Sequence, residues 1–127
     1  MPKQLAIVLV NWNSFDLTRD TIHSLQKTSF QNYDCIVVDN GSADDSAQQL
    51  EKIFPEIILL RSEINKGFTG GNNLGMHYAL YKGYELIMML NNDVEVLSQR
   101  SGDQNTYISS IRAKLDVDSN DGEEVEK

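Results

Sequence analysis

Four clusters rich in asparagine, aspartate and glycine contain many of the side chains in this sequence that could bind a ligand. They occupy residues 11–13, 39–42, 65–73 and 91–93. Amide side chains donate and accept hydrogen bonds, carboxylates accept them and bind hard cations, and glycines permit unusual backbone angles. Each cluster also has a purely structural interpretation, as a turn, a strand exit or a loop that needs positive φ. The clusters can act together only if the fold brings them to one place.

Short apolar runs precede these clusters and are predicted to be strands of one sheet. The runs cover residues 5–10, 33–39, 57–61 and 86–90 and lack polar alternation, as is typical of strands buried on both faces. Because helical segments separate them, the order β-α-β-α-β-α-β predicts a three-layer α/β/α fold with a mainly parallel sheet. Ligands of such sheets bind outside the carboxyl ends of the strands.

The first two helical segments have recognisable faces and ends. One is expected over about 14–27, with Leu17, Ile22 and Leu25 buried. The next is expected to follow Ser42 as its N-cap and to end before Pro55.

The third helical segment follows the glycine-rich cluster. It is expected to begin near Gly71 and to end at Gly83, a residue type that commonly terminates helices. Leu74, Tyr78 and Tyr81 are expected on its inner face.

The composition excludes several classes of protein. The 127 residues include 19 acidic and 11 basic side chains, for a net charge of −8. Since nucleic-acid affinity comes mainly from Lys and Arg neutralising phosphates, no nucleic-acid partner is expected. No apolar run reaches the length of a membrane span, and the single cysteine, Cys35, excludes a disulfide framework. We therefore expect a cytoplasmic protein.

Four segments carry a resemblance to a known family. They are AIVLVNWN (6–13), VVDNGSADDS (37–46), NKGFTGGNNLG (65–75) and LNND (90–93). In order and spacing they resemble the family 2 glycosyltransferases, most closely the rhamnosyltransferase-like branch, over about residues 5–96. The resemblance implies a truncated GT-A fold, the fold of nucleotide-diphospho-sugar transferases. It also implies binding of a nucleotide-diphosphate sugar and transfer of the sugar to an acceptor hydroxyl with inversion.

The resemblance assigns roles to individual residues. Asp39 would accept a hydrogen bond from N3–H of a pyrimidine base, and Asn40 or the Asn11 region would donate to its carbonyl oxygens. Asp93 matches the last acid of the family's metal-binding motif and would hold Mg²⁺ or Mn²⁺ with phosphate oxygens. Asn91 replaces the commoner first acid of that motif. The expected nucleotide-sugar-binding residues are Val10, Asn11, Asn13, Asp39, Asn40, Gly71, Asn72, Asn73, Asn91 and Asn92.

A change of composition near residue 97 divides the chain. Residues 1–97 are predicted to be the nucleotide-sugar-binding α/β domain, and residues 98–127 a polar acidic tail, with one short helix near Tyr107–Leu115. In the family, a second half supplies the acceptor site and the general base, and residues 98–127 do not resemble it. Two hypotheses stay open: a transferase completed by a partner or another copy, and a non-catalytic nucleotide-sugar-binding module or truncated remnant.

The fourth apolar run suggests self-association. An apolar edge strand without a neighbour is a site of pairing between chains. Because two-fold pairs are the commonest soluble assembly, a homodimer through residues 86–90 and 98–115 is expected.

Overall fold

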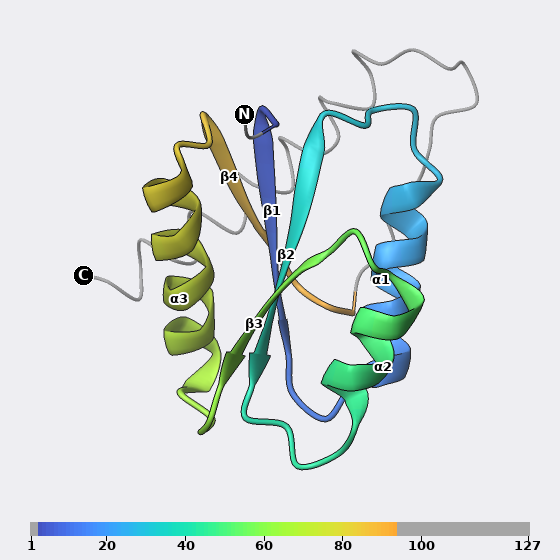
Figure 1. Ribbon diagram of the computed structural model, residues 1–127, viewed down its shortest axis with the longest axis vertical. Coiled ribbons are helices and arrows are strands. Elements are labelled where there is room, and N and C mark those ends of the chain that lie inside the picture. Colours follow the sequence, from blue (N-terminus) through green and yellow to red (C-terminus); the bar gives the residue numbers. More distant parts are fainter. Residues whose placement is uncertain (1–2, 94–127) are drawn as a thin grey trace.

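The computed structural model describes residues 3–93, in which strands and helices alternate along the chain (Figure 1). The elements are β1 (Leu5–Asn11), α1 (Phe15–Gln26), β2 (Tyr33–Asn40), α2 (Ser46–Ile53), β3 (Ile58–Ser62), α3 (Gly67–Lys82) and β4 (Leu86–Leu90). The strands form one four-stranded sheet in the order β3-β2-β1-β4, and all neighbours are parallel. The predicted α/β fold with a parallel sheet is confirmed.

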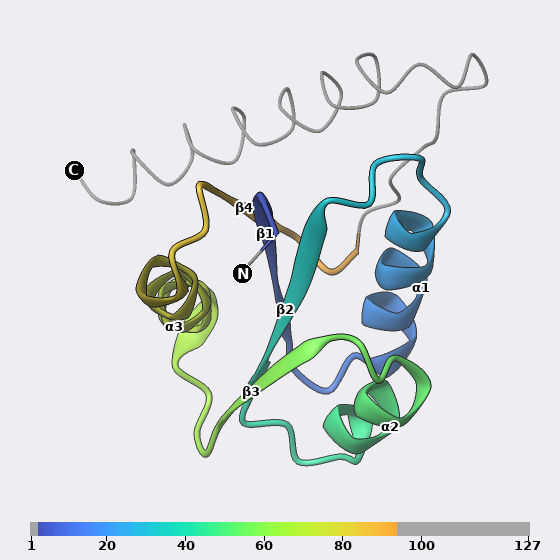
Figure 2. The same ribbon diagram turned by 45° about the horizontal axis from the view of Figure 1, so that its top comes forward.

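Helices cover both faces of this sheet. α1 and α2 lie on one face and α3 lies on the other (Figure 2). Successive side chains of a strand point to opposite faces, so each strand contributes to two separate cores. The core beneath α1 and α2 includes Ile7, Leu9, Val37, Ile22, Leu25, Leu50 and Phe54. The core beneath α3 includes Ala6, Val8, Ile36, Val38 and Ala79. The position of a residue along its strand therefore decides which helices it meets.

The third helix is longer than the sequence predicted. α3 begins at Gly67 rather than near Gly71, so most of the glycine-rich cluster is helical. It ends as predicted at Gly83, which adopts a left-handed φ of 87° and donates its N–H to carbonyl groups of the last turn.

Close packing of α3 on the sheet explains two of its glycines. A Cβ atom at Gly75 would overlap Cγ1 of Val8. A Cβ atom at Gly71 would lie 3.0 Å from Cγ1 of Val10 and 3.1 Å from Nδ2 of Asn40. Since protein interiors have few voids, side chains at these positions would push the helix away from β1 and β2.

The second helix starts later than expected. α2 begins at Ser46, with Asp45 at its N-cap position. Ser42 is not the cap, because its hydroxyl donates to Oδ1 of Asp39 at 2.7 Å. The segment between β2 and α2 is thus attached to the end of the strand.

Two apolar residues expected inside are exposed. Leu17 on α1 is 50% exposed and Tyr81 on α3 is 86% exposed, whereas Ile22 and Leu25 are buried as predicted. On α3 the buried positions are Gly71, Asn72, Gly75 and Ala79. Leu74 and Tyr78 are partly buried and pack against the core beneath α3, so Tyr81 is the one of the three expected residues that the structure exposes.

Several expectations concern residues beyond the described range. The tail at 98–127, its short helix, the domain boundary at 97 and the dimer segment 98–115 all lie outside the described residues. The homodimer stays a prediction; β4 is an edge strand of the described sheet, and Leu86 is 41% exposed. In the described part of the chain, each helix is too short or too polar to cross a membrane.

Candidate functional site

The carboxyl ends of the four strands lie at one edge of the sheet because all strands are parallel (Figure 1). At this edge, strand alternation sends neighbouring residues to opposite faces. Asn11 and Asp39 pair across β1 and β2 and contact residues of the α1–α2 side. Val10 and Asn40 lie on the α3 side, where both approach Gly71. The structure therefore brings the predicted residues to one edge but divides them between two faces.

Asp39 is the centre of a buried polar network on the α1–α2 side. Its side chain is 1% exposed, and Oδ1 accepts hydrogen bonds from Asn11 Nδ2 at 3.0 Å and from the Ser42 hydroxyl at 2.7 Å. Within residues 3–93, Oδ2 accepts a single hydrogen bond, the longer one from the Ser42 N–H at 3.3 Å. Asn11 Nδ2 also donates to the hydroxyl of Ser46 at 2.9 Å. One carboxylate oxygen is therefore fully used inside the protein and the other retains most of its accepting capacity.

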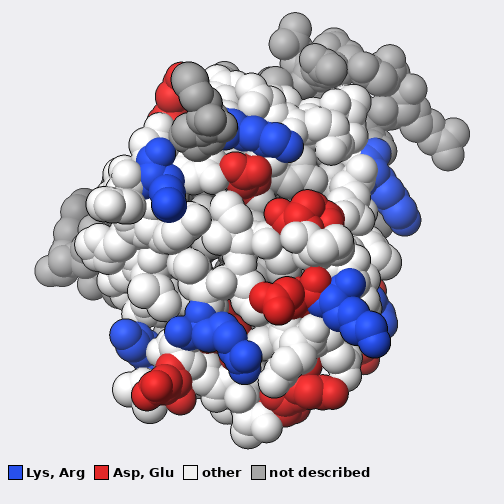
Figure 3. All heavy atoms as spheres, in the orientation of Figure 1, with Lys and Arg blue, Asp and Glu red and all other residues white. Residues whose placement is uncertain are grey.

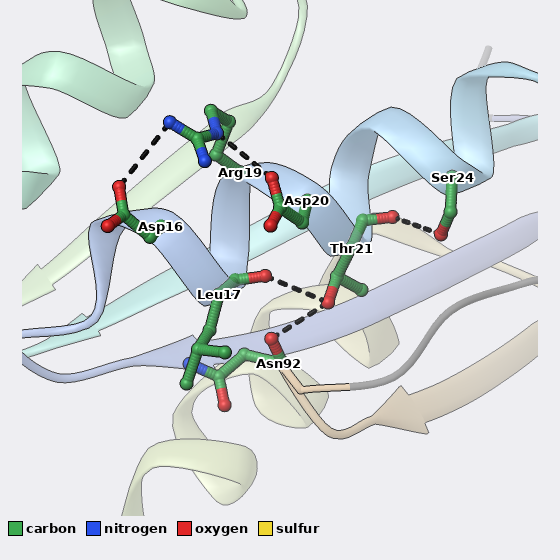
Figure 4. A network of polar contacts seen from close by, with 7 residues as sticks. All are labelled: Asp16, Leu17, Arg19, Asp20, Thr21, Ser24 and Asn92. Atoms are coloured by element: carbon green, nitrogen blue, oxygen red, sulfur yellow. Dashed lines mark hydrogen bonds and ion pairs between the residues drawn. The ribbon is translucent and has the colours of Figure 1, made fainter.

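This network continues across β1 to the segment after β4. The Thr18 hydroxyl of α1 donates to Asn11 Oδ1 at 2.7 Å, and Asn92 Nδ2 donates to Thr18 Oγ1 at 3.1 Å. The hydroxyl of Thr21 donates to the backbone carbonyl of Asn92 at 2.8 Å, as Figure 4 shows. Residues at the ends of β1 and β2 and just after β4 are thus connected through one face of α1.

Asn13 joins the first two loops of the site. It has a positive φ of 49°, a conformation that asparagine tolerates better than most residues. Its side-chain oxygen accepts hydrogen bonds from the backbone N–H groups of Ala43 at 2.8 Å and Asp44 at 3.3 Å. Its own backbone N–H donates to the Ser42 hydroxyl at 2.9 Å. The predicted ligand residue Asn13 therefore holds the β2–α2 loop in this structure.

Asn40 plays a similar part on the α3 side. Its side-chain nitrogen donates to Asn65 Oδ1 at 3.1 Å and to the Gly67 carbonyl at 2.9 Å, and its oxygen accepts from the Lys66 N–H at 3.0 Å. Asn40 is 2% exposed. It therefore fixes the loop that leads into α3 and thereby positions the N-terminus of that helix.

Asn72 differs from these amides because its side chain is buried without a partner. It lies in the second turn of α3 and is 5% exposed, and none of the hydrogen bonds found within residues 3–93 involves its side chain. Leaving a buried amide unpaired is costly, so such a group calls for an explanation, which a ligand or a water can supply. Asn73, the next residue, is partly exposed.

The segment after β4 carries the predicted metal ligand. Asn91 and Asp93 are exposed, and Asn92 is partly buried. Within the described residues, no three His, Cys, Asp or Glu side chains cluster to hold a metal, so Asp93 would act as a single carboxylate. Such a donor set fits Mg²⁺ or Mn²⁺, which take oxygen ligands from phosphates and keep several waters.

The sequence analysis missed one residue at this edge. Trp12 follows β1 directly and is 50% exposed. An aromatic side chain between two asparagines at the end of a predicted strand was a readable signal, since half-exposed aromatic rings offer a stacking surface for bases and sugars.

Charges of both signs surround the described body. Figure 3 shows Lys and Arg interspersed with Asp and Glu over the face seen in Figure 1. Hydrogen bonds from the side chain and backbone of Ser46 lower the pKa of Asp44, so this carboxylate at the site edge is ionised at neutral pH. Burial raises the pKa of Cys35 to about 12, which keeps its thiol protonated and unreactive.

A comparison of the sequence with protein families decides the assignment. Residues 6–125 match the family described as Glycosyl transferase family 2. The chain belongs to the family 2 glycosyltransferases. The matched region extends beyond residue 97, where the sequence analysis expected the pattern of this glycosyltransferase family to end.

A curated relative supports the same family. The low-salt glycan biosynthesis hexosyltransferase Agl10 of Haloferax volcanii is 31% identical over 97 residues. The match covers 76% of this glycosyltransferase chain and 30% of the relative. The chain therefore spans less than a third of that relative's length.

Solved structures share the fold. S. aureus TarS 1–349 in complex with UDP superimposes with a TM-score of 0.68 at 20% identity, over 84% of this chain and 32% of that chain. The mannosyltransferase PcManGT from Pyrobaculum calidifontis, in complex with GDP-Man and Mn²⁺, gives a TM-score of 0.62 at 14% identity, over 75% and 29% of the two chains. At these identities the likeness shows the fold, and the expected GT-A fold is confirmed.

Proposed function

We propose that this chain binds a nucleotide-diphosphate sugar, together with Mg²⁺ or Mn²⁺, as the donor-binding part of an inverting glycosyltransferase. The family assignment supports glycosyl transfer, and the ligands of the structural neighbours, UDP in one and GDP-Man with Mn²⁺ in another, support the donor class. The hexosyltransferase relative supports a hexose as the transferred sugar. The order and spacing of the four motifs suggest the rhamnosyltransferase-like branch as a narrower assignment.

The observation that carries this proposal is the unpaired amide of Asn72. α3 directs its N-terminal N–H groups toward the edge where the strands end, and helix N-termini attract phosphate groups. Asn72 adds a buried side chain that can both donate and accept, and it directly follows Gly71, the residue of α3 that approaches Val10 and Asn40. A nucleotide diphosphate at this edge would supply the partner that this amide lacks.

The other residues of the edge have complementary roles in the proposal. Trp12 offers a ring on which a base can stack. Asp39 Oδ2, which accepts one long hydrogen bond, is the oxygen that could receive N3–H of a uracil base. Asp93 would bind the metal, which when present neutralises the charge that develops on the leaving diphosphate.

Replacing Asn72 by alanine is expected to weaken nucleotide binding without lowering stability. A buried amide with no partner contributes little to the folded state, and alanine is the better helix former. UDP affinity in the presence of Mn²⁺, measured by calorimetry, should fall by about tenfold, the loss of one hydrogen bond of roughly 1.4 kcal/mol. Thermal unfolding without ligand should give the wild-type midpoint.

Asn32→Ala is the matched control for this experiment. Asn32 is exposed at the opposite end of the sheet, where its oxygen accepts from the Gln4 N–H. UDP affinity should be unchanged in this variant. Wild-type affinity in Asn72→Ala, or a strong loss of stability there, would show that Asn72 belongs to the core and not to a nucleotide site.

Replacing Trp12 by alanine is expected to weaken nucleotide binding through loss of stacking. Base–aromatic stacking contributes roughly 1–3 kcal/mol per base, so UDP affinity should fall by about 5- to 150-fold. Because Trp12 is the single tryptophan of the chain, quenching of its fluorescence by UDP reports the contact directly in the wild-type protein.

Tyr81→Ala provides the control for removing an exposed aromatic ring. Tyr81 lies near the C-terminal end of α3 and is 86% exposed. The Tyr81→Ala variant should bind UDP as the wild-type protein does. If UDP leaves the Trp12 fluorescence unchanged while calorimetry shows binding, the base does not stack on this residue.

A further inference from the structure

Thr18 is a buried hydroxyl in the middle of the polar network that links β2, β1 and the segment after β4. Threonine inside a helix commonly bonds the carbonyl group four residues earlier, as Thr21 does with the carbonyl of Leu17 at 3.0 Å. Thr18 instead uses its hydroxyl for two distant partners: it donates to Asn11 and accepts from Asn92. Its position on α1 is therefore explained by the network and not by the helix.

The hydrogen bonds of this network run in one consistent direction. Asn11 turns its NH₂ group toward Asp39, whose Oδ1 accepts a hydrogen bond from Asn11 Nδ2 at 3.0 Å. The carbonyl oxygen of Asn11 then faces Thr18 and takes its single hydroxyl proton. Thr18 can therefore only accept from Asn92, which must present its NH₂ group to Thr18.

One atom at the end of this network is left free. With its NH₂ group turned to Thr18, Asn92 turns its side-chain oxygen away from α1, and none of the hydrogen bonds within residues 3–93 is donated to that oxygen. Amide oxygens are among the ligands and hydrogen-bond acceptors that surround hard cations and their bound waters. Asn92 directly precedes Asp93, the carboxylate assigned to the metal.

Burial makes this arrangement stiff. Thr18 and Asn11 are both 0% exposed, so water cannot replace a bond that either loses. The Thr21 hydroxyl adds a second anchor, because it shares its proton between the carbonyls of Leu17, at 3.0 Å, and Asn92, at 2.8 Å (Figure 4). The segment that carries Asp93 is thus held to α1 at both the side chain and the backbone of Asn92.

We propose that Thr18 is a positioning residue for the metal end of the site. It orients Asn92, and through Asn92 the segment of Asp93, and it connects this end with Asp39 at the other end. The inference rests on the proposed function, because it concerns the same metal and diphosphate. The inference adds to the site a residue of α1, Thr18, that contacts neither the metal nor the diphosphate.

The test compares Thr18→Val with Thr18→Ser in the full chain. Mn²⁺ affinity at saturating UDP should fall about tenfold in Thr18→Val, as is typical when a residue that orients a metal ligand is removed. The electron paramagnetic resonance signal of free Mn²⁺ measures this affinity. Thr18→Ser keeps the hydroxyl and should restore the affinity. Thr28→Val is the matched control, because Thr28 is buried, lies beyond the C-terminal end of α1 and donates its hydroxyl to the carbonyls of Leu25 and Phe30.

A double-mutant cycle separates positioning from a general loss of structure. If Thr18 acts through Asn92, then Asn92→Ala alone should weaken Mn²⁺ binding about as much, and adding Thr18→Val should cause no further loss. Asn92 is only partly buried, so its variant keeps the test valid even if Thr18→Val unfolds. Additive losses, an equal loss in Thr28→Val, or unchanged Mn²⁺ affinity in Thr18→Val would overturn the inference.

A measurement without ligand distinguishes failure of this inference from failure of the proposed function. The NMR signals of the Asn92 side-chain NH₂ protons should be shifted and protected in the wild-type protein and should lose both properties in Thr18→Val. If they do not change, Thr18 does not orient Asn92, whatever the protein binds. If they change but the wild-type protein binds no UDP with Mn²⁺, the proposed function is wrong and the metal role of Thr18 is overturned with it.

Discussion

Replacing Asp93 by alanine is expected to abolish the extra stability that Mn²⁺ gives to the UDP-bound protein. A ligand at 100 times its Kd stabilises the folded state by about 2.7 kcal/mol, a difference that thermal unfolding detects readily. Asp93 is exposed, and none of the ion pairs or hydrogen bonds within the described residues involves its side chain, so the variant should fold normally. The measurement is the unfolding midpoint at fixed UDP, with and without Mn²⁺.

Asp45→Ala is the control for the loss of one negative charge at the same edge of the sheet. Asp45 is exposed at the N-cap position of α2 and makes no capping hydrogen bond with its side chain. Its variant should keep the full Mn²⁺ effect. A retained Mn²⁺ effect in Asp93→Ala would remove this residue from the metal site, and an equal loss in both variants would reduce its role to general electrostatics.

Replacing Asp39 by alanine is expected to lower the free energy of unfolding by about 3 kcal/mol. The substitution leaves Asn11 Nδ2 and the Ser42 hydroxyl without their shared acceptor, in a region where Asp39 is 1% exposed, and stranded buried donors cost about 1–3 kcal/mol each. Since small domains have only about 5–15 kcal/mol of stability in total, this is a large fraction. Chemical denaturation of the ligand-free protein measures it.

Asp20→Ala shows what the loss of an exposed carboxylate costs. Asp20 pairs with Arg19 on the surface of α1, and exposed ion pairs contribute about 0–1 kcal/mol. A loss in Asp39→Ala no larger than in Asp20→Ala would contradict the network described above. The ligand role of Asp39 is a separate question, answered by UDP affinity measured well below the unfolding transition of the variant.

Both predictions depend on how one edge of the sheet is built. Asp93 is exposed and can bind a metal ion without giving up a contact within the described residues. In Asp39, by contrast, Oδ1 already accepts hydrogen bonds from Asn11 and from Ser42 of the β2–α2 loop. We therefore expect substitutions near Asp93 to change metal binding alone, and substitutions near Asp39 to change stability and binding together. The Thr18 network is the physical connection between these two parts.

The sequence by itself determined the order of the elements and the edge where the site lies. Continuous apolar runs without alternation indicate buried parallel strands, and the strands found at Leu5–Asn11 and Leu86–Leu90 agree with them to within a residue. Gly83 ended its helix as predicted, because a left-handed residue there depends on local backbone chemistry. The polar clusters follow the strands, so parallel topology alone places them at one edge.

Only the tertiary structure decided which face each residue of that edge meets. Consecutive side chains of a strand point in opposite directions, so Asp39 lies on the α1–α2 side while Asn40 bonds the loop before α3. The sequence motif alone does not show this division between the two faces. Thr18 could not be recognised in the sequence, because its partners Asn11 and Asn92 come from other elements and meet it only after the sheet has formed. The burial of Asn72 and the exposure of Tyr81 depend on how α3 packs on the sheet, where Gly71 and Gly75 lie against Val10 and Val8, and this packing involves residues of other elements.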